Sequence, residues 1–134
     1  MSNRYLNYID GEWVGADSGR TFAVHNPGTG EKIAEVPECG SAETRRAIEA
    51  AERAFPGWRA MTAEQRYRLL HAIYDKIMEN QKRLAEIISL ENGKPLAEAM
   101  GEVVFGANFF LWYAEETKRI YGETIPSLAA NKRI

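Results

Sequence analysis

The sequence predicts a segment in which short N-terminal β-hairpins are followed by about four α-helices. Residues 1–40 combine strand-forming residues with turn dipeptides, and from residue 41 onward apolar residues recur with a helical period of about 3.6. The 134 residues are 45% hydrophobic and 27% charged, a composition that excludes intrinsic disorder. We therefore expect β-hairpins over 1–40, a helical layer over 41–122 and the start of a strand over 123–134.

The hairpins are predicted from their turns. Asp10-Gly11 lies between two short runs of aromatic and β-branched residues. This dipeptide favours a type I′ turn, because both central positions need a positive φ. Farther along, the β-rich stretches 21–24 and 32–36 flank turn-forming residues at 26–30, which predicts a second hairpin.

The first two helices are predicted from their ends. Ser41 is the expected N-cap of the first helix, which we expect to stop near Phe55 because Pro56-Gly57 follows. Thr62 and Gln65 have the spacing of a capping box, in which each side chain accepts the backbone N–H of the other residue. A second helix is therefore expected to begin there.

Two further helices complete the predicted helical layer. The third covers the apolar pattern of residues 84–90 and ends at Gly93, which suits the left-handed position after a helix. Pro95 then takes the first position of the fourth helix, where no backbone N–H is needed. Apolar residues keep helical spacing from there to Gly122, so the last helix is expected to be long.

Aromatic residues gather in the middle of the last helix, namely Phe105, Phe109, Phe110, Trp112 and Tyr113. On spacing alone, core packing against the other helices is favoured over a ligand-binding wall. The apolar residues also extend round more of the helix than one core-facing stripe requires. We therefore expect an apolar face of this helix to stay exposed in the isolated chain.

No residue pattern predicts a self-contained active site. Gly28-Thr29-Gly30 lacks the third glycine of a dinucleotide fingerprint and is interpreted as a turn. Gly93-Lys94 is not followed by the Ser or Thr of a phosphate-binding loop. Cys39 has an acidic neighbour, which disfavours a reactive thiolate. His25 and His71 lack the spacing of metal ligands, so no metal site is predicted.

Charge and composition narrow the class of protein. The formal net charge of −2 argues against a nucleic-acid-binding surface, which needs clustered Lys and Arg. No apolar run approaches the roughly 18 residues that span a bilayer, so no membrane association is predicted. The first ten residues lack the pattern of a secretory signal, and the one cysteine fits a reducing compartment. We expect a soluble cytoplasmic protein.

Five blocks, in order along the chain, resemble the opening of aldehyde dehydrogenases. The blocks are Tyr8–Trp13, Asn26–Glu31, Ala54–Arg59, Leu90–Pro95 and Ile120–Pro126. The stretch from Glu98 to Pro126 is most similar to bacterial succinate-semialdehyde dehydrogenases, and Asn131–Ile134 fits the same subgroup. The resemblance covers essentially the whole chain, whereas the chain covers only the first part of the family's length.

The resemblance implies an α/β fold for the full-length parent, with residues 1–134 as the N-terminal part of its cofactor-binding domain. Members of the family use NAD or NADP and oxidise an aldehyde through cysteine attack, hydride transfer and thioester hydrolysis. A glutamate serves as base and an asparagine side chain contributes to the oxyanion hole. The resemblance puts these residues and the dinucleotide-binding strands beyond Ile134, and Cys39 does not match the nucleophile motif. No catalytic, cofactor-binding or metal-binding residue is therefore assigned here, and the chain alone is expected to need no cofactor.

The resemblance does imply one role for residues of this chain. It places Phe105 on the helix that lines the substrate entrance, and Phe109 follows four residues later on the same face. The alternative, that both rings are simply core residues, stays open at this point. The implied partners are the remainder of the dehydrogenase chain and, in the family, further copies in a homo-oligomer.

Two functions are compatible with these observations. The first is an N-terminal fragment, inactive alone, of an NAD(P)-dependent enzyme that oxidises succinate semialdehyde or a similar short aldehyde to the acid. The second is a non-catalytic aldehyde dehydrogenase-like binding or assembly module. The ending at Asn131–Ile134 resembles the first residues of a strand more than a capped terminus, and this favours the fragment.

Overall fold

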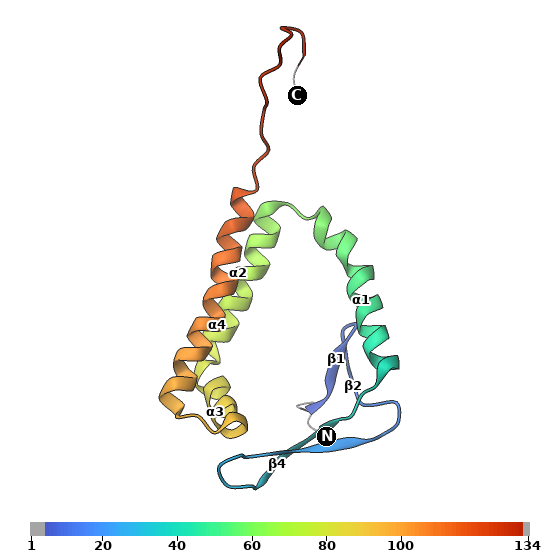
Figure 1. The fold of residues 1–134 in the computed structure, drawn as a ribbon, viewed down its shortest axis with the longest axis vertical. Helices are drawn as coiled ribbons and strands as arrows, with labels where there is room; N and C mark the ends of the chain where they lie inside the picture. Colours follow the sequence, from blue (N-terminus) through green and yellow to red (C-terminus); the bar gives the residue numbers. More distant parts are fainter. Residues whose placement is uncertain (1–4, 133–134) are drawn as a thin grey trace.

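A computed structural model describes residues 5–132, which form two β-hairpins followed by four α-helices (Figure 1). In the first hairpin, β1 (Asn7–Ile9) pairs antiparallel with β2 (Glu12–Val14). Asp10 and Gly11 between them have φ values of 54° and 85°. Both φ values are positive, as the type I′ prediction requires, and the predicted hairpin is confirmed.

The second hairpin pairs β3 (Thr21–His25) antiparallel with β4 (Lys32–Pro37). In the turn between them, the Asn26 side-chain oxygen accepts the Gly28 N–H at 2.8 Å. Gly30 has a φ of 76°, which an L-residue with a side chain rarely adopts. The interpretation of Gly28-Thr29-Gly30 as a turn is therefore confirmed.

Helix α1 (Ser41–Ala60) differs from the prediction at both ends. Gly40 occupies the N-cap position and Ser41 is already helical, while the Glu43 carboxylate accepts the Gly40 N–H at 2.9 Å. The helix also continues through Pro56 for one further turn, so the predicted stop near Phe55 is wrong. Proline removes one backbone donor, but within the last turns of a helix the following residues still close onto earlier carbonyls.

The predicted start of α2 (Ala63–Glu79) and the predicted end of α3 (Gln81–Asn92) are confirmed. The Thr62 hydroxyl accepts the Gln65 N–H at 3.2 Å, and the Gln65 side chain accepts the Thr62 N–H at 2.9 Å, which confirms the capping box. Gly93 ends α3 with a φ of 82°. A Cβ at Gly93 would lie 3.1 Å from the Pro27 ring, so the turn of the second hairpin lies against this helix end.

Helix α4 (Leu96–Glu116) is shorter than predicted. Pro95 takes the N-cap position just before it, and the chain tightens into the 3-10 turn η2 (Thr117–Arg119) instead of continuing to Gly122. No strand begins within residues 123–132, because no neighbouring strand lies there to supply the ladder of hydrogen bonds. The remaining part of the expected strand, residues 133–134, lies outside the described residues.

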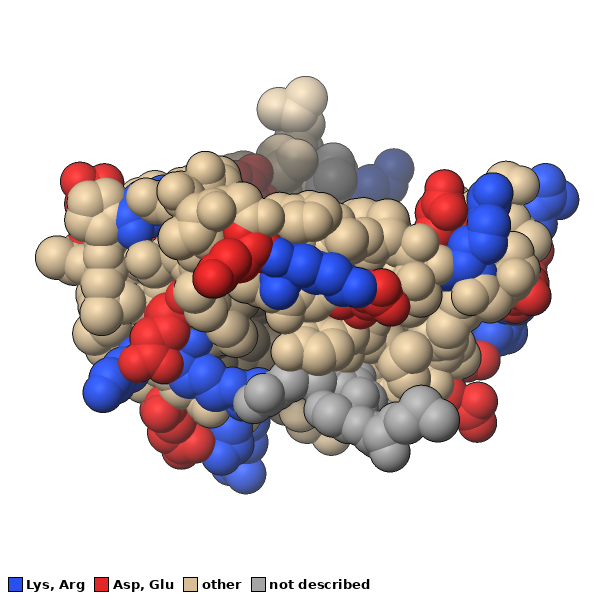
Figure 2. Space-filling view, turned by 90° about the horizontal axis from the view of Figure 1, so that it is seen from below, with Lys and Arg blue, Asp and Glu red and all other residues tan. Residues whose placement is uncertain are grey.

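The core lies where α4 runs antiparallel beside α2 and also packs on α3 (Figure 1). The buried apolar residues of α3 and α4 there are small: Ala85, Ala99, Val103, Ala107 and Ala114. Within residues 5–132 no large side chain is fully buried, whereas many large apolar ones are exposed. Seen from below, acidic and basic side chains are interspersed around surface that carries no charge (Figure 2). The segment therefore packs α2, α3 and α4 together but leaves most of its large apolar groups exposed.

Candidate functional site

One side of α4 forms an aromatic face, which we define by its residues Phe105, Asn108, Phe109, Trp112 and Tyr113. These residues line a shallow hollow of about 460 Å³. Each of them has another three or four residues away, so an α-helix brings them onto one surface. The Phe105 and Phe109 rings meet edge to face, with centroids 5.1 Å apart and an interplanar angle of 88°.

The side of α4 that faces the other helices explains why the rings point outward. Ala99, Val103 and Ala107 are buried against α2 and α3, and Ala114 is buried near the C-terminal end of α4. Small side chains let the helix axes approach closely, but they leave no room for rings between them. The aromatic residues therefore occupy the opposite side of the helix.

Exposure decides between the two interpretations of the aromatic cluster within this segment. Phe105 is 67% exposed and Trp112 is 68% exposed, and the other rings of the cluster are exposed as well. The prediction that these rings pack into the core against the other helices is therefore wrong for residues 5–132. The prediction that α4 presents an apolar face is confirmed, because these rings stay exposed in this part of the chain.

Beyond the aromatic face, acidic residues at the end of α4 pair with basic residues of η2. Arg119 donates to Glu116 at 2.7 Å, and Lys118 lies 3.4 Å from Glu115. The Lys118 ammonium also lies 3.3 Å from the centroid of the Tyr67 ring, a cation–π contact that links η2 to α2. These groups stabilise the end of the helix and do not line the aromatic hollow.

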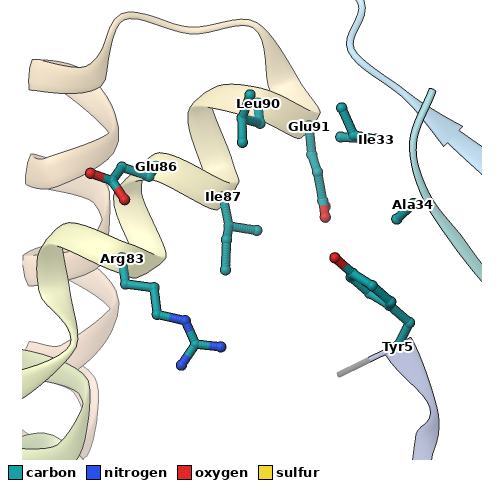
Figure 3. A pocket seen from close by; sticks show the side chains of 8 residues that line it. All are labelled: Tyr5, Ile33, Ala34, Arg83, Glu86, Ile87, Leu90 and Glu91. Carbon is teal, nitrogen blue, oxygen red and sulfur yellow. The ribbon is translucent and has the colours of Figure 1, made fainter. Parts of the chain in front are cut away.

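A second hollow lies between α3 and the N-terminal hairpins (Figure 3). The Tyr5 hydroxyl and the Glu91 carboxylate point toward one another across it, and Arg83 and Glu86 lie farther along α3. Ile33 and other aliphatic residues form the rest of its wall. Both charge signs and an aliphatic wall are typical of a packing seam between elements, so we assign no chemistry to this hollow.

The remaining sequence candidates lie apart from the aromatic face. The Cys39 thiol sits in the loop before α1, where the Asn7 amide donates to its sulfur at 2.9 Å. His71 lies on α2, with its Nδ1 atom 3.1 Å from the Asp75 carboxylate, and His25 lies on β3. Among residues 5–132, no group of three or more His, Cys, Asp or Glu side chains is arranged to hold a metal ion.

A buried carboxylate fixes the loop after the first hairpin onto α1, and the sequence did not indicate it. Glu43 is 5% exposed and accepts the backbone N–H of Asp17 at 2.7 Å as well as that of Gly40. These backbone donors, Asp17 first, hold the pKa of Glu43 below its ordinary value. Beside it, Arg46 makes a two-pronged ion pair with the Asp17 carboxylate, both contacts being 2.7 Å.

The aldehyde dehydrogenase family model matches residues 13–134. The chain belongs to the aldehyde dehydrogenase family. Over 131 residues it is 55% identical to a glutarate-semialdehyde dehydrogenase of Pseudomonas aeruginosa, covering 98% of this chain and 27% of that relative. It is 51% identical to the NADP(+) succinate-semialdehyde dehydrogenase of Escherichia coli, covering 94% of this chain and 26% of the relative.

Solved structures of the family agree in fold. A succinate-semialdehyde dehydrogenase from Burkholderia pseudomallei matches with a TM-score of 0.90 and 51% identity, over 97% of this chain and 27% of that one. A betaine aldehyde dehydrogenase from Staphylococcus aureus, in complex with NAD+, matches with a TM-score of 0.88 and 34% identity. The match covers 98% of this chain and 28% of that one. These matches confirm the family resemblance and the expected N-terminal piece of an α/β fold. The chain spans about a quarter of the length of these relatives.

For an aldehyde dehydrogenase segment, the placement of the glycine motif is informative. Gly28-Thr29-Gly30 lies between two strands of a hairpin, not between a strand and the N-terminus of a helix. A dinucleotide pyrophosphate needs the latter arrangement, so this motif does not fit the cofactor. None of the helices described over residues 5–132 is long and apolar enough to cross a membrane.

Proposed function

We propose that the chain is the N-terminal part of an NAD(P)-dependent aldehyde dehydrogenase that oxidises succinate semialdehyde or a similar short semialdehyde to the carboxylic acid. The observation that carries the proposal is the identity of 51–55% to enzymes named as succinate- and glutarate-semialdehyde dehydrogenases, over 94–98% of the chain. Because the chain spans about a quarter of these relatives, the remainder of the polypeptide is its first partner. We further propose a cytoplasmic homo-oligomer.

Within this proposal, Phe105 and Phe109 form part of the wall of the substrate entrance. Three features support this role. The two rings are 67% and 51% exposed, they hold each other in an edge-to-face pair, and they share a hollow with one amide, that of Asn108. A mostly aromatic surface with few polar groups is typical of sites that take a short carbon chain.

The chain alone is proposed to be inactive. Nucleophile, base and dinucleotide site must be assembled in one place for this reaction, and the Gly-x-Gly motif at residues 28–30 lies in a hairpin turn that does not fit a dinucleotide. The test compares the purified chain with the longer polypeptide encoded by the same gene. Each is incubated with succinate or glutarate semialdehyde and NAD+ or NADP+, and formation of the reduced nucleotide is followed by absorbance.

The longer polypeptide is expected to reduce the nucleotide and the chain alone is not. Turnover by the chain alone, surviving removal of contaminating enzymes, would contradict its inactivity. A longer polypeptide that prefers aldehydes without a terminal acid group would contradict the proposed substrate class. A polypeptide that ends without the remaining three-quarters would favour the binding or assembly module instead.

A further inference from the structure

Arg66, at the end of the first turn of α2, has a buried polar atom without a partner among residues 5–132. Its Nε is buried, and no atom of residues 5–132 accepts a hydrogen bond from it. No carboxylate of these residues lies within 4.0 Å of its guanidinium. Arg68, two residues later, is an ordinary surface arginine by comparison, because its side chain is 76% exposed and pairs with Glu64 at 2.8 Å.

An unpaired buried N–H of this kind calls for an acceptor. Burying a polar group without a hydrogen bond is unfavourable, and nearly all buried donors in folded proteins are therefore paired. A guanidinium cannot escape the penalty by losing its proton, as a lysine or histidine can. Residues 5–132 supply no acceptor for the Arg66 Nε.

The surface beside Arg66 shows what kind of segment brings that acceptor. Ile73 lies seven residues after Arg66, about two helical turns, so the two share one face of α2. Ile73 and Leu69 are 41% and 46% exposed, and both line a hollow of about 770 Å³ that extends to Trp58 on α1 and Ile87 on α3. This surface is apolar and open, and the buried apolar residues of the neighbouring helices α3 and α4 are mostly alanine.

The charges at this surface are basic. Lys76 and Arg83 also line the hollow. Lys76 pairs with Glu79 at 2.6 Å, whereas Arg83 makes no ion pair within residues 5–132. A covering segment that presents an acid therefore complements the charge, and a carboxylate matches the planar fork of a guanidinium better than a single carbonyl does.

We infer that Arg66 binds a carboxylate of the polypeptide that follows residue 134, and that the same downstream segment lays apolar side chains over Leu69 and Ile73. The inference rests on the proposed function in one respect, namely that this chain continues into the remaining three-quarters of a dehydrogenase. The site acts as an anchor between the helical layer and the rest of the enzyme. It takes no part in the chemistry.

The test uses the full-length protein and hydrogen exchange followed by mass spectrometry, which does not depend on activity. Arg66→Met, Arg66→Gln and Arg66→Lys are compared with the matched surface variant Arg68→Met. Arg66→Met is expected to speed exchange by about tenfold or more at the start of α2 and in one segment beyond residue 134, because both sides of the anchor lose protection together. Arg68→Met is expected to change neither.

The conservative variants identify the acceptor. Glutamine keeps an N–H donor but no charge, so with a carboxylate partner Arg66→Gln should behave like Arg66→Met, while Arg66→Lys retains part of the protection. Protection retained by Arg66→Gln would instead indicate a carbonyl acceptor and overturn the carboxylate. Unchanged exchange beyond residue 134 in Arg66→Met overturns the anchor. Loss of the oligomer in light scattering would assign the surface to a second subunit and overturn the intrachain contact.

Discussion

Replacing Phe105 by alanine in the full-length enzyme separates an entrance residue from a core residue. In this segment the side chain is 67% exposed, so about one third of it is buried. Full burial of a Phe side chain contributes roughly 1.5–3 kcal/mol, so one third contributes about 0.5–1 kcal/mol. The edge-to-face pair with Phe109 adds about 0.5–1.5 kcal/mol. We therefore expect Phe105→Ala to lower the free energy of unfolding by about 1–2.5 kcal/mol.

A core residue behaves differently. If the rest of the enzyme buries Phe105 completely, the same substitution should cost roughly 3–5 kcal/mol, because it leaves a cavity. As an entrance residue, Phe105 instead contacts the substrate, and loss of about 1 kcal/mol of that contact lowers kcat/KM about fivefold. The size of this loss should vary with the aldehyde, while the KM for NAD+ or NADP+ should stay unchanged.

Two measurements on the same variant decide the matter. Urea unfolding gives the loss of stability, and steady-state kinetics with several aldehydes give the selectivity. Phe55→Ala is the matched control, because Phe55 is 59% exposed but lies on α1, away from the aromatic face. Unchanged kcat/KM ratios together with a stability loss in the core range would refute the reasoning and leave Phe105 as a core residue.

Three further predictions concern stability of the same enzyme. Glu43→Gln should lower the melting temperature at neutral pH. The difference from wild type should shrink as the pH falls below about 4.5, because the lowered pKa of Glu43 stabilises the fold only while the carboxylate is ionised. Thermal melts recorded against pH test this, with Glu52→Gln as the control. In urea unfolding, Gly93→Ala should lower the free energy of unfolding more than Gly30→Ala. Both glycines have a positive φ, but a Cβ at residue 93 would also lie 3.1 Å from the Pro27 ring. Thr62→Ala should lower the free energy of unfolding by about 1 kcal/mol, because the capping box is lost. A change near zero would contradict the assigned cap.

Local chemistry made several features predictable from the sequence. The turn at Asp10-Gly11, the capping box at Thr62 and the helix end at Gly93 each depend on the backbone preferences of two to four neighbouring residues. Such preferences act whatever the rest of the protein does. The ordered family blocks likewise identified the chain as an aldehyde dehydrogenase segment, because each block is a run of adjacent residues that is recognisable without its tertiary neighbours.

Other features depended on which element lies opposite which. The alanine side of α4 faces α2 and α3, so the rings of the aromatic face point outward, although apolar spacing alone favoured burying them. Glu43 is buried because a loop from the first hairpin brings the Asp17 N–H to it, a contact between residues 26 positions apart. Arg66 likewise has no acceptor among its own neighbours. Sequence periodicity shows which residues share a face of a helix. Whether that face is buried depends on its tertiary neighbours, and periodicity does not give their positions.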